Sequence, residues 1–362
     1  MGLSRVAVVA SAQTELRPSW HSAQHIDLIS SVVTSVFKGT GLTLDDVDFV
    51  IDSGSDVLDG RSISNCGFLG ALGAHHKEEA RVEEDGLFAA LYGVNKIRSG
   101  ASQVGLIVAY SKPSESSVDA YWSAMVEPFY QRPTGFSQAA ALGIQAQRYL
   151  ATGGRSTEDL AGIVAERWAA AARYGNVATG DVPDAAAVLG SGDAATPLTK
   201  LMMAQPMDGA VAVLIAREDI ARRATHAPVF VTGMGTSMDR HAFATRDAGK
   251  LASAEAAAAM AYKKAGWGGA EADVAEVSGA SVVGEALAID ALGLADGKAR
   301  INASGGGLPA DTIMATGLIR LAHASRQLAE PDAYGDQSPA RAIVHGAGGI
   351  AMQSNCVFTL EV

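Results

Sequence analysis

The sequence predicts an α/β protein built from two copies of one α/β unit that face each other. Residues 6–54 recur without a gap as residues 231–279, and each copy ends in a Ser-Gly pair that begins at Ser53 or Ser278. The shared plan is a strand, a loop, an amphipathic helix, a turn and a second strand. The two copies are offset by 225 residues, so this is not a solenoid unit, because solenoid periods run about 20–50 residues. Paired halves place a cleft at their strand ends, where ligands usually bind.

Length and composition limit the function classes. The chain has 362 residues, of which 48% are hydrophobic, so it can bury a large core over two ordinary domains. Its net charge of −11 argues against non-specific binding to nucleic acid or to an anionic membrane surface. No apolar run approaches the ~18 residues that a transmembrane helix needs.

The apolar segment 6–12 has some features of a minimal signal peptide. It is very short, however, and its duplicate at 229–235 lies in mid-chain, where no signal peptide could act. We therefore interpret both segments as first strands and expect a cytoplasmic protein. The two cysteines, Cys66 and Cys356, fit a reducing compartment and predict neither a disulfide framework nor a metal site.

The first half alternates strands and helices. Its β-branched runs predict strands, and its apolar residues at helical spacing predict helices. A near-continuous apolar run is typical of a strand buried in a parallel sheet. The predicted elements are strands at 6–10, 47–51, 104–110 and 208–216, and helices between residues 26 and 38 and over 86–98.

Residues 111–200 interrupt this alternation, and we interpret them as an inserted loop domain. Two helices are predicted here, over about 137–151 and 157–174. The segment also carries aromatic residues that fit either a lid on a hydrophobic pocket or anchors that pack on the core: Tyr121, Trp122, Phe129 and Tyr130. Residues 1–110 plus 201–226 then form the first half.

Residues 227–362 form the second half, with the same alternation. Strands are predicted at 229–233, 273–277, 342–345 and 353–361, and helices at 252–265, 283–292 and up to about 328. Strand–helix alternation in both halves favours mostly parallel sheets.

Four segments, in order along the chain, resemble the thiolase superfamily and, more narrowly, its lipid-transfer-protein or SCP2-thiolase-like branch. The segment 197–212 resembles the stretch that leads to Asp-Gly-Ala in that branch. Asn302-Ala303-Ser304-Gly305-Gly306 resembles Asn-Pro-Ser-Gly-Gly, residues 315–318 resemble the segment after Gly-His-Pro, and residues 346–349 resemble the glycine-rich C-terminal turn.

The resemblance implies a duplicated thiolase fold with five layers, α-β-α-β-α. It also implies a homodimer and a site for a coenzyme A thioester as substrate, with no permanently bound cofactor and no metal. A small OB-fold or zinc-ribbon partner protein is a further implication of the branch. We expect an acyl-CoA ligand and no nucleic-acid or membrane partner.

The chain departs from the family at the catalytic loops. Glu83 takes the place of the nucleophilic cysteine, Asp311 falls in the Gly-His-Pro segment, and His345 takes the place of the second cysteine. A carboxylate cannot carry the acyl group as a thioester, so cysteine-dependent thiolysis is not expected. The predicted catalytic residues are His345 as base, with Asp311 or Glu83 as acid or orienting partner.

Substrate and oxyanion contacts are predicted at the neighbouring turns. The Asn-Glu-Ala-Phe loop of the family becomes residues 278–281 here. The predicted contact residues are Ser278, Gly279, Asn302, Gly306, Gly348 and Gly349. Glycine at such turns also permits close approach of a ligand.

Each candidate has a structural alternative. Glu83, like Glu84 and Asp85, could serve only as an acidic residue at a helix N-terminus. His345 could be a core histidine, and Asp311 could be a helix N-cap. Asn302 and Ser304 could simply shape the glycine turn.

Two functions remain open. The first is an enzyme that cleaves or forms a carbon–carbon bond in an acyl-CoA without a cysteine acyl-enzyme. A retro-aldol lyase acting on a steroid or lipid side chain fits best, and acyl transfer is a variant. The second is a non-catalytic thiolase-like subunit that binds acyl-CoA for, or scaffolds, a partner enzyme of lipid metabolism.

Overall fold

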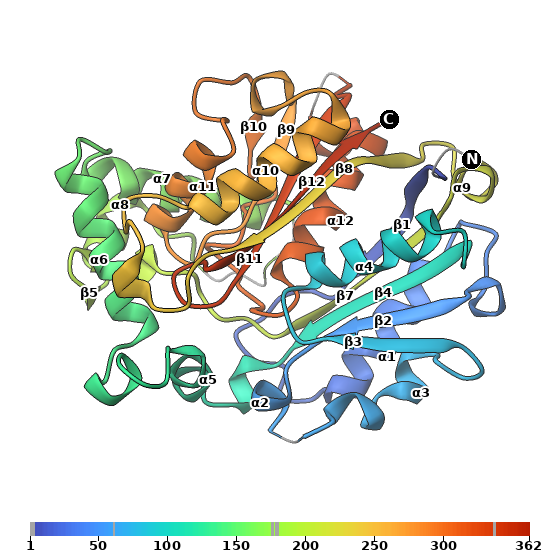
Figure 1. Ribbon diagram of the computed structural model, residues 1–362, viewed down its shortest axis with the longest axis horizontal. Helices are drawn as coiled ribbons and strands as arrows, with labels where there is room; N and C mark the ends of the chain where they lie inside the picture. Colours follow the sequence, from blue (N-terminus) through green and yellow to red (C-terminus); the bar gives the residue numbers. More distant parts are fainter. Residues whose placement is uncertain (1–3, 61, 175–176, 178–180, 336–337) are drawn as a thin grey trace.

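The computed structural model describes residues 4–60, 62–174, 177, 181–335 and 338–362. The chain forms five layers, α-β-α-β-α, as the resemblance implied (Figure 1). The strands are β1 Val6–Gln13, β2 Phe49–Ser53, β3 Glu78–Val82, β4 Val104–Ser111, β5 Asp193–Ala195, β6 Leu198–Thr199, β7 Gly209–Arg217, β8 Val229–Met238, β9 Val274–Val277, β10 Arg300–Ile301, β11 Arg341–Gly348 and β12 Ser354–Glu361. The helices are α1 His25–Val36, α2 Asp56–Asp59, α3 Leu69–Leu72, α4 Gly86–Arg98, α5 Val118–Met125, α6 Gln138–Ala151, α7 Thr157–Arg173, α8 Ala185–Leu189, α9 Glu218–Ala224, α10 Ala252–Ala265, α11 Val282–Ala291 and α12 Thr316–Ala329.

The duplication predicted from the sequence is confirmed by the strand order. The first half is ordered β3-β2-β4-β7-β1, and the second half repeats this order as β10-β9-β11-β12-β8. The two halves join where β1 pairs with β8, at Ala7 with Phe230 and Val8 with Val229. Helices α1 and α10 occupy equivalent places, as the sequence alignment of the halves requires.

Three hydrophobic clusters fill the spaces between the layers. One lies between α1 and the first half's strands, and another lies between α10, α11 and the second half's strands. The third surrounds α4 and α12, which pack against each other between the two halves of the continuous sheet. Alternate residues of each strand therefore face either this central layer or an outer layer.

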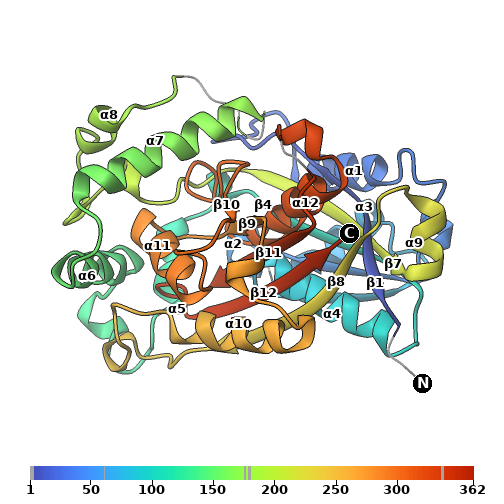
Figure 2. The same cartoon turned by 90° about the horizontal axis from the view of Figure 1, so that it is seen from above.

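The inserted segment packs on the second half. Helices α6 and α7 contact α11, and their apolar residues belong to the same cluster as those of α10 and α11 (Figure 2). The segment thus shares a core with its neighbour instead of having one of its own. Helix α5 extends toward α2 of the first half, which brings Tyr121 over Met314.

Candidate active site

A small cavity lies where the N-termini of α4 and α12 meet. Its walls come from both halves and from α5 of the insertion. The lining includes three acidic residues, Glu84, Asp85 and Asp311, together with the hydroxyl-bearing side chains of Tyr121, Ser278 and Thr316. Its volume is about 40 Å³, which is room for water molecules but not for a thioester.

Glu84 occupies one side of this cavity. Its Oε1 accepts a hydrogen bond of 3.0 Å from the hydroxyl of Ser354 on β12. Burial raises the pKa of Glu84 above its ordinary value. A side chain at Gly348 would be excluded, because a Cβ there would lie 1.8 Å from Glu84 Oε1. Glycine on β11 therefore makes room for this carboxyl group.

Asp311 occupies another wall and is fixed by short-range bonds. Its Oδ1 accepts from the Thr316 hydroxyl at 2.8 Å and from the backbone N–H of Ile313 at 2.9 Å. Burial raises the pKa of Asp311, while these two donors and the Arg320 charge oppose that rise. Asp311 therefore lines the cavity, and its carboxylate is oriented by the start of α12.

Asp85 links the two central helices. As N-cap of α4 it accepts from the Leu87 N–H through Oδ1 at 2.9 Å, and its Oδ2 accepts from the Gly317 N–H of α12 at 2.6 Å. Burial raises its pKa to about 8, although both N–H groups oppose this. Both oxygens are engaged with backbone, so Asp85 holds the two halves together at the cavity floor.

Tyr121 and Trp122 close the cavity from the inserted segment. The Tyr121 hydroxyl lies 3.7 Å from the Met314 sulfur. Burial raises the pKa of Tyr121, as do the negative charges of Glu84 and Asp311, so the phenol stays protonated. Of the four aromatic residues interpreted as either a lid or core anchors, these two line the cavity, whereas Phe129 and Tyr130 are 80% and 83% exposed.

The end of β9 supplies a backbone amide to the cavity. Ser278 donates both its N–H and its hydroxyl to the carbonyl of His345, at 3.2 and 2.9 Å. The next residue, Gly279, lines the cavity, and its N–H has no hydrogen-bond acceptor among the residues that the structure describes. Gly348 and Gly349 also line the cavity, in agreement with their predicted position.

The backbone around the cavity is strained. Ile313 and Met352, which both line it, have positive φ angles of 56° and 57°. Branched and bulky residues rarely adopt this conformation, and such strain concentrates at functional sites.

Two predicted catalytic residues lie outside the cavity. Glu83 is half exposed, and its carboxylate accepts from the Asp56 N–H at 2.8 Å and pairs with Arg81 at 3.3 Å. Helix α4 begins at Gly86. In the segment before it, Glu84 lines the cavity, whereas the adjacent Glu83 does not. Convergence of Glu83 with Asp311 was therefore a wrong prediction.

His345 lies in the middle of β11 and faces the outer layer that contains α10, not the acidic cavity. Val344 packs in the central cluster, so its neighbour His345 faces α10, where its Nε2 bonds to Asn355 Oδ1 at 2.8 Å. Burial lowers its pKa to about 4, which keeps the imidazole neutral. The prediction that His345 joins Asp311 in one cavity is wrong; its contribution is the carbonyl that holds Ser278.

Asn302 and Gly306 also lie outside the cavity lining. Asn302 donates to Glu285 of α11 at 2.8 Å and accepts from the Val277 N–H of β9 at 2.6 Å. Gly306 has a φ of 70°, and a Cβ there would lie 2.5 Å from the Asn302 amide nitrogen. Both residues therefore shape the turn after β10, which for Asn302 was the structural alternative.

A buried ion pair missed from the sequence lies behind the cavity. Arg320 of α12 donates to Glu276 of β9 at 2.6 Å and to the Ser304 hydroxyl at 2.6 Å. Gln327 completes the cluster by donating to Glu276 at 2.8 Å. The signal that could have found it is an arginine inside the otherwise apolar run 317–322, since a buried charge requires a partner.

Neither cysteine lines the cavity. Cys66 is exposed, and Cys356 is buried on β12, where burial and the charges of Asp85 and Glu84 raise the pKa of its thiol. Within the described residues, no group of three or more His, Cys, Asp or Glu side chains is placed to hold a metal ion. In the same part of the chain, no helix combines the length and apolar character needed to cross a membrane.

No protein-family model matches the chain, and no curated protein sequence matches it. Solved structures do. The Ltp2-ChsH2(DUF35) aldolase superposes with a TM-score of 0.82 at 18% identity, covering 99% of this chain and 98% of the other. Human mitochondrial 3-ketoacyl-CoA thiolase gives 0.78 at 17% identity, covering 100% and 99%. The monomeric SCP2-thiolase like protein type 1 from Mycobacterium smegmatis gives 0.75 at 17% identity, covering 98% and 76%. The resemblance found in the sequence is thus confirmed at the level of architecture, and the chain has the thiolase fold.

Proposed function

We propose that this chain is a thiolase-fold enzyme that cleaves or forms a carbon–carbon bond in an acyl-CoA thioester without a cysteine acyl-enzyme. The observation that carries the proposal is the content of the cavity. Carboxyl groups of Glu84 and Asp311 and the phenol of Tyr121 line it, whereas both cysteines lie elsewhere. These are acid–base groups and not nucleophiles suited to thioester exchange.

Retro-aldol cleavage of a 3-hydroxyacyl-CoA needs one general base and one general acid, and Asp311 and Glu84 can fill these two roles. Asp311, whose carboxylate is held by two donors, takes the proton of the substrate's 3-hydroxyl group. The Cα–Cβ bond then breaks, its electron pair forms the thioester enolate, and Cβ leaves as a ketone or aldehyde. Glu84, with a pKa raised by burial, donates a proton to Cα and yields the shorter acyl-CoA.

Charge develops on the thioester oxygen in this reaction. The Gly279 N–H, which has no acceptor among the described residues, and the protonated Tyr121 hydroxyl are the donors best placed to stabilise it. Such donors are worth several kcal/mol, about 2.7–4 for one oxyanion-hole group. In the proposed reaction the neutral His345 acts only through its carbonyl, which positions the loop.

The aldolase among the similar structures supports this choice of reaction, because it is named as an aldolase and has the same fold. Its name also includes a second protein, ChsH2(DUF35). We extend the proposal to a homodimer and to a small partner protein of the OB-fold class. A steroid or lipid side chain is the proposed acyl group.

A second candidate is a non-catalytic subunit that binds acyl-CoA for a partner. The observation in its favour is that the residues at the two cysteine positions of the family, Glu83 and His345, both lie outside the cavity. Under this alternative the carboxyl groups serve only to cap helices.

The decisive experiment incubates the purified protein with pools of 3-hydroxyacyl-CoA and 3-oxoacyl-CoA, alone and with a candidate OB-fold partner. Mass spectrometry then measures shorter CoA esters. Asp311→Asn and Glu84→Gln are expected to lower kcat by about 10²–10⁴. Glu83→Gln is the matched control, since Glu83 faces Arg81 outside the cavity, and it should retain activity. Binding without turnover in every mixture favours the non-catalytic subunit.

A further inference from the structure

The acidic cavity at the N-termini of α4 and α12 contains one buried amide side chain that the proposed reaction does not use. Gln138, the first residue of α6, lines the cavity and is only 7% exposed. Its Oε1 accepts a hydrogen bond of 2.8 Å from the backbone N–H of Ala351. Because that N–H can only donate, the bond determines which end of the amide is the oxygen. The Nε2 group is therefore the free end of this side chain.

The loop that holds the Gln138 amide is itself fixed on several sides. Ala351 has a φ of 50°, which residues other than glycine rarely adopt. Gln145, two turns further along α6, donates to the Ala351 carbonyl at 3.5 Å, and Arg246 donates to the Ile350 carbonyl at 2.8 Å. The Gln138 amide is thus oriented before any ligand binds, which is the condition under which a donor is most effective.

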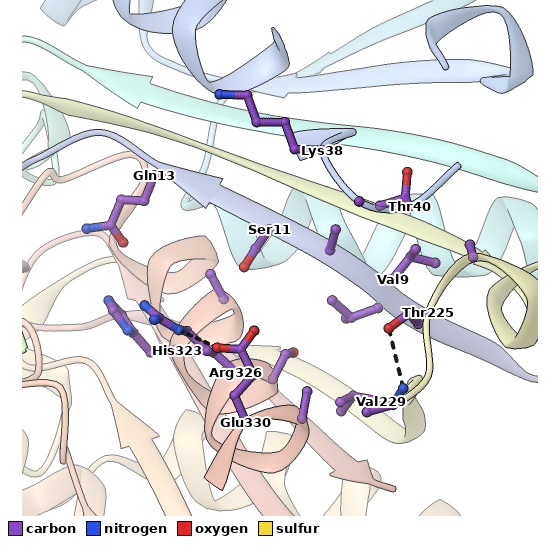
Figure 3. A pocket seen from close by; sticks show the side chains of 18 of the residues that line it. Val9, Ser11, Gln13, Lys38, Thr40, Thr225, Val229, His323, Arg326 and Glu330 are labelled. Atoms are coloured by element: carbon purple, nitrogen blue, oxygen red, sulfur yellow. Dashed lines mark hydrogen bonds and ion pairs between the residues drawn. The ribbon is translucent and has the colours of Figure 1, made fainter. Parts of the chain in front are cut away.

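The free Gln138 nitrogen is open to its cavity. It has no acceptor among the described residues, yet it is not closed to water. The contrast is a larger cavity of about 550 Å³ beside the C-terminal part of α12, between β1 and the start of β8 (Figure 3). The unpaired side-chain atoms of Gln13, His323 and Ser325 there are closed to water, so a ligand in that cavity cannot reach them. Only a donor that is buried and open, as in Gln138, can be satisfied by a ligand.

The chemistry of the cavity selects the kind of atom that this donor binds. The Nε2 group only donates, whereas the carboxylates of Glu84 and Asp311 only accept when ionised. A substrate hydroxyl suits the carboxylates, and an oxygen without a hydrogen suits Nε2. The carbonyl oxygen of a thioester is such an atom. Because the cavity now measures about 40 Å³, lining side chains rotate to admit the thioester, a change that is common on ligand binding.

We infer that Gln138 donates a hydrogen bond through Nε2 to the thioester carbonyl oxygen of the bound substrate. The inference rests on the acyl-CoA ligand of the proposed function. It adds a side-chain donor to the Gly279 N–H and the Tyr121 hydroxyl. When the Cα–Cβ bond breaks, its electron pair forms the enolate and negative charge gathers on this oxygen. The hydrogen bond then strengthens without transfer of the Nε2 proton, so it stabilises the transition state more than the bound substrate.

The test measures the binding of two coenzyme A derivatives that differ in one oxygen. Acetyl-CoA has the thioester carbonyl, and ethyl-CoA, its thioether counterpart, lacks it. Isothermal titration calorimetry of the full-length protein gives Kd for both. Gln138→Met removes the donor at similar side-chain length, so it should weaken acetyl-CoA binding about 3- to 10-fold and ethyl-CoA binding less than about twofold. In the CoA-ester assay, kcat of this variant should fall about 10²–10³-fold.

Gln145→Met is the matched control. Gln145 lies on the same helix and bonds to the same loop residue, Ala351, but it does not line the cavity. This variant should leave the ratio of the two Kd values unchanged. If Gln138→Met does not fold, as judged by circular dichroism, Gln138→Glu replaces it. That variant keeps an acceptor for the Ala351 N–H, and its ionised carboxylate cannot donate.

Three outcomes overturn the inference. An equal loss of affinity for acetyl-CoA and ethyl-CoA in the Gln138 variant does so and leaves the proposed function standing. A change of the Kd ratio that is as large in Gln145→Met also does so, because Gln138 then acts only by holding the loop. Binding of neither derivative to the unmodified protein overturns it together with the acyl-CoA ligand of the proposed function.

Discussion

The two halves carry their buried charges on opposite faces of equivalent strands. In the first half the buried carboxylate of β2 is Asp52, which faces the outer layer and pairs with Arg81 at 2.9 Å. In the second half it is Glu276 of β9, one alignment position earlier, which faces the central layer and pairs with Arg320 at 2.6 Å. Because successive residues of a strand point to opposite faces, one position decides which layer receives the charge.

The two buried ion pairs have different effects on the cavity. The Arg81 side chain also lies near Asp59 and Glu83, so the first half's charges form a cluster beside the cavity that keeps Glu83 out of it. The Arg320 pair instead holds α12, whose N-terminus carries the donors to Asp311 and Asp85. The equivalent strands of the two halves thus send their buried carboxylates to different layers, although both copies end in Ser-Gly.

Removal of Arg320 tests the second half's pair and has the largest expected effect. Arg320→Ala leaves Glu276 buried without its cation and should lower the free energy of unfolding by about 3–5 kcal/mol. Urea denaturation measures the loss. The control is Arg326→Ala on the same helix, whose exposed pair with Glu330 is worth about 0.3–0.5 kcal/mol. Equal losses in both variants contradict the assignment of the pair to the core.

The pH dependence of stability tests the role of Asp85, whose carboxyl group accepts hydrogen bonds from α4 of the first half and α12 of the second half. Burial raises the pKa of Asp85 to about 8, above its unfolded value near 4. The native state therefore binds more protons than the unfolded state between these two values, and stability falls as pH rises through that window. Urea midpoints measured from about pH 7 to pH 8 should show this fall, because below that range the buried histidines His323 and His345, whose pKa values are lowered, change stability in the opposite direction.

The Asp85→Asn variant identifies the group responsible. Its amide does not ionise, so the part of the fall that belongs to Asp85 disappears, although the variant loses one of the two bonds to backbone N–H. A pH slope that is the same in Asp85→Asn and in the unmodified protein contradicts the role given to this carboxyl group.

The two Ser-Gly pairs provide a closer comparison. Ser53 donates to the carbonyls of Glu84 and Met314, whereas Ser278 supports the carbonyl of His345, which still accepts from the Ser278 N–H. Ser53→Ala should therefore cost about 1–3 kcal/mol and Ser278→Ala about 0.5–1.5 kcal/mol in unfolding free energy. Thermal denaturation of both variants measures the difference, and a larger loss for Ser278→Ala reverses the comparison.

The smallest expected effect is on turnover in His345→Gln. His345 faces α10 and not the acidic cavity, so kcat/KM should stay within about threefold of the unmodified protein, or about 0.7 kcal/mol. The same CoA-ester assay measures it, with Asp311→Asn as the contrasting variant. Loss of activity as large as that of Asp311→Asn restores His345 as a catalytic candidate.

Much of the fold could be predicted from the sequence because its signals are local or repeated. The duplicated segment, the buried run of β4 and the helix over 86–98 followed from apolar periodicity. Strand β3 was missed, since Glu78-Glu79-Ala80-Arg81-Val82 is a charged edge strand whose apolar alternation is limited to Ala80 and Val82. The central pairing of α4 with α12 had no local signal at all.

The sequence by itself determined that two like halves exist, that no thiol replaces the missing family cysteine, and that acidic residues precede α4 and α12. Only the tertiary structure decided which of those acids line a common cavity. Just before α4, Glu84 lines the cavity and the adjacent Glu83 lies outside it. His345 faces the outer layer, because its neighbour Val344 on the same strand faces the central layer. The physical reason is that residue type and spacing are properties of the chain, whereas the direction of a side chain depends on the layer against which its element packs.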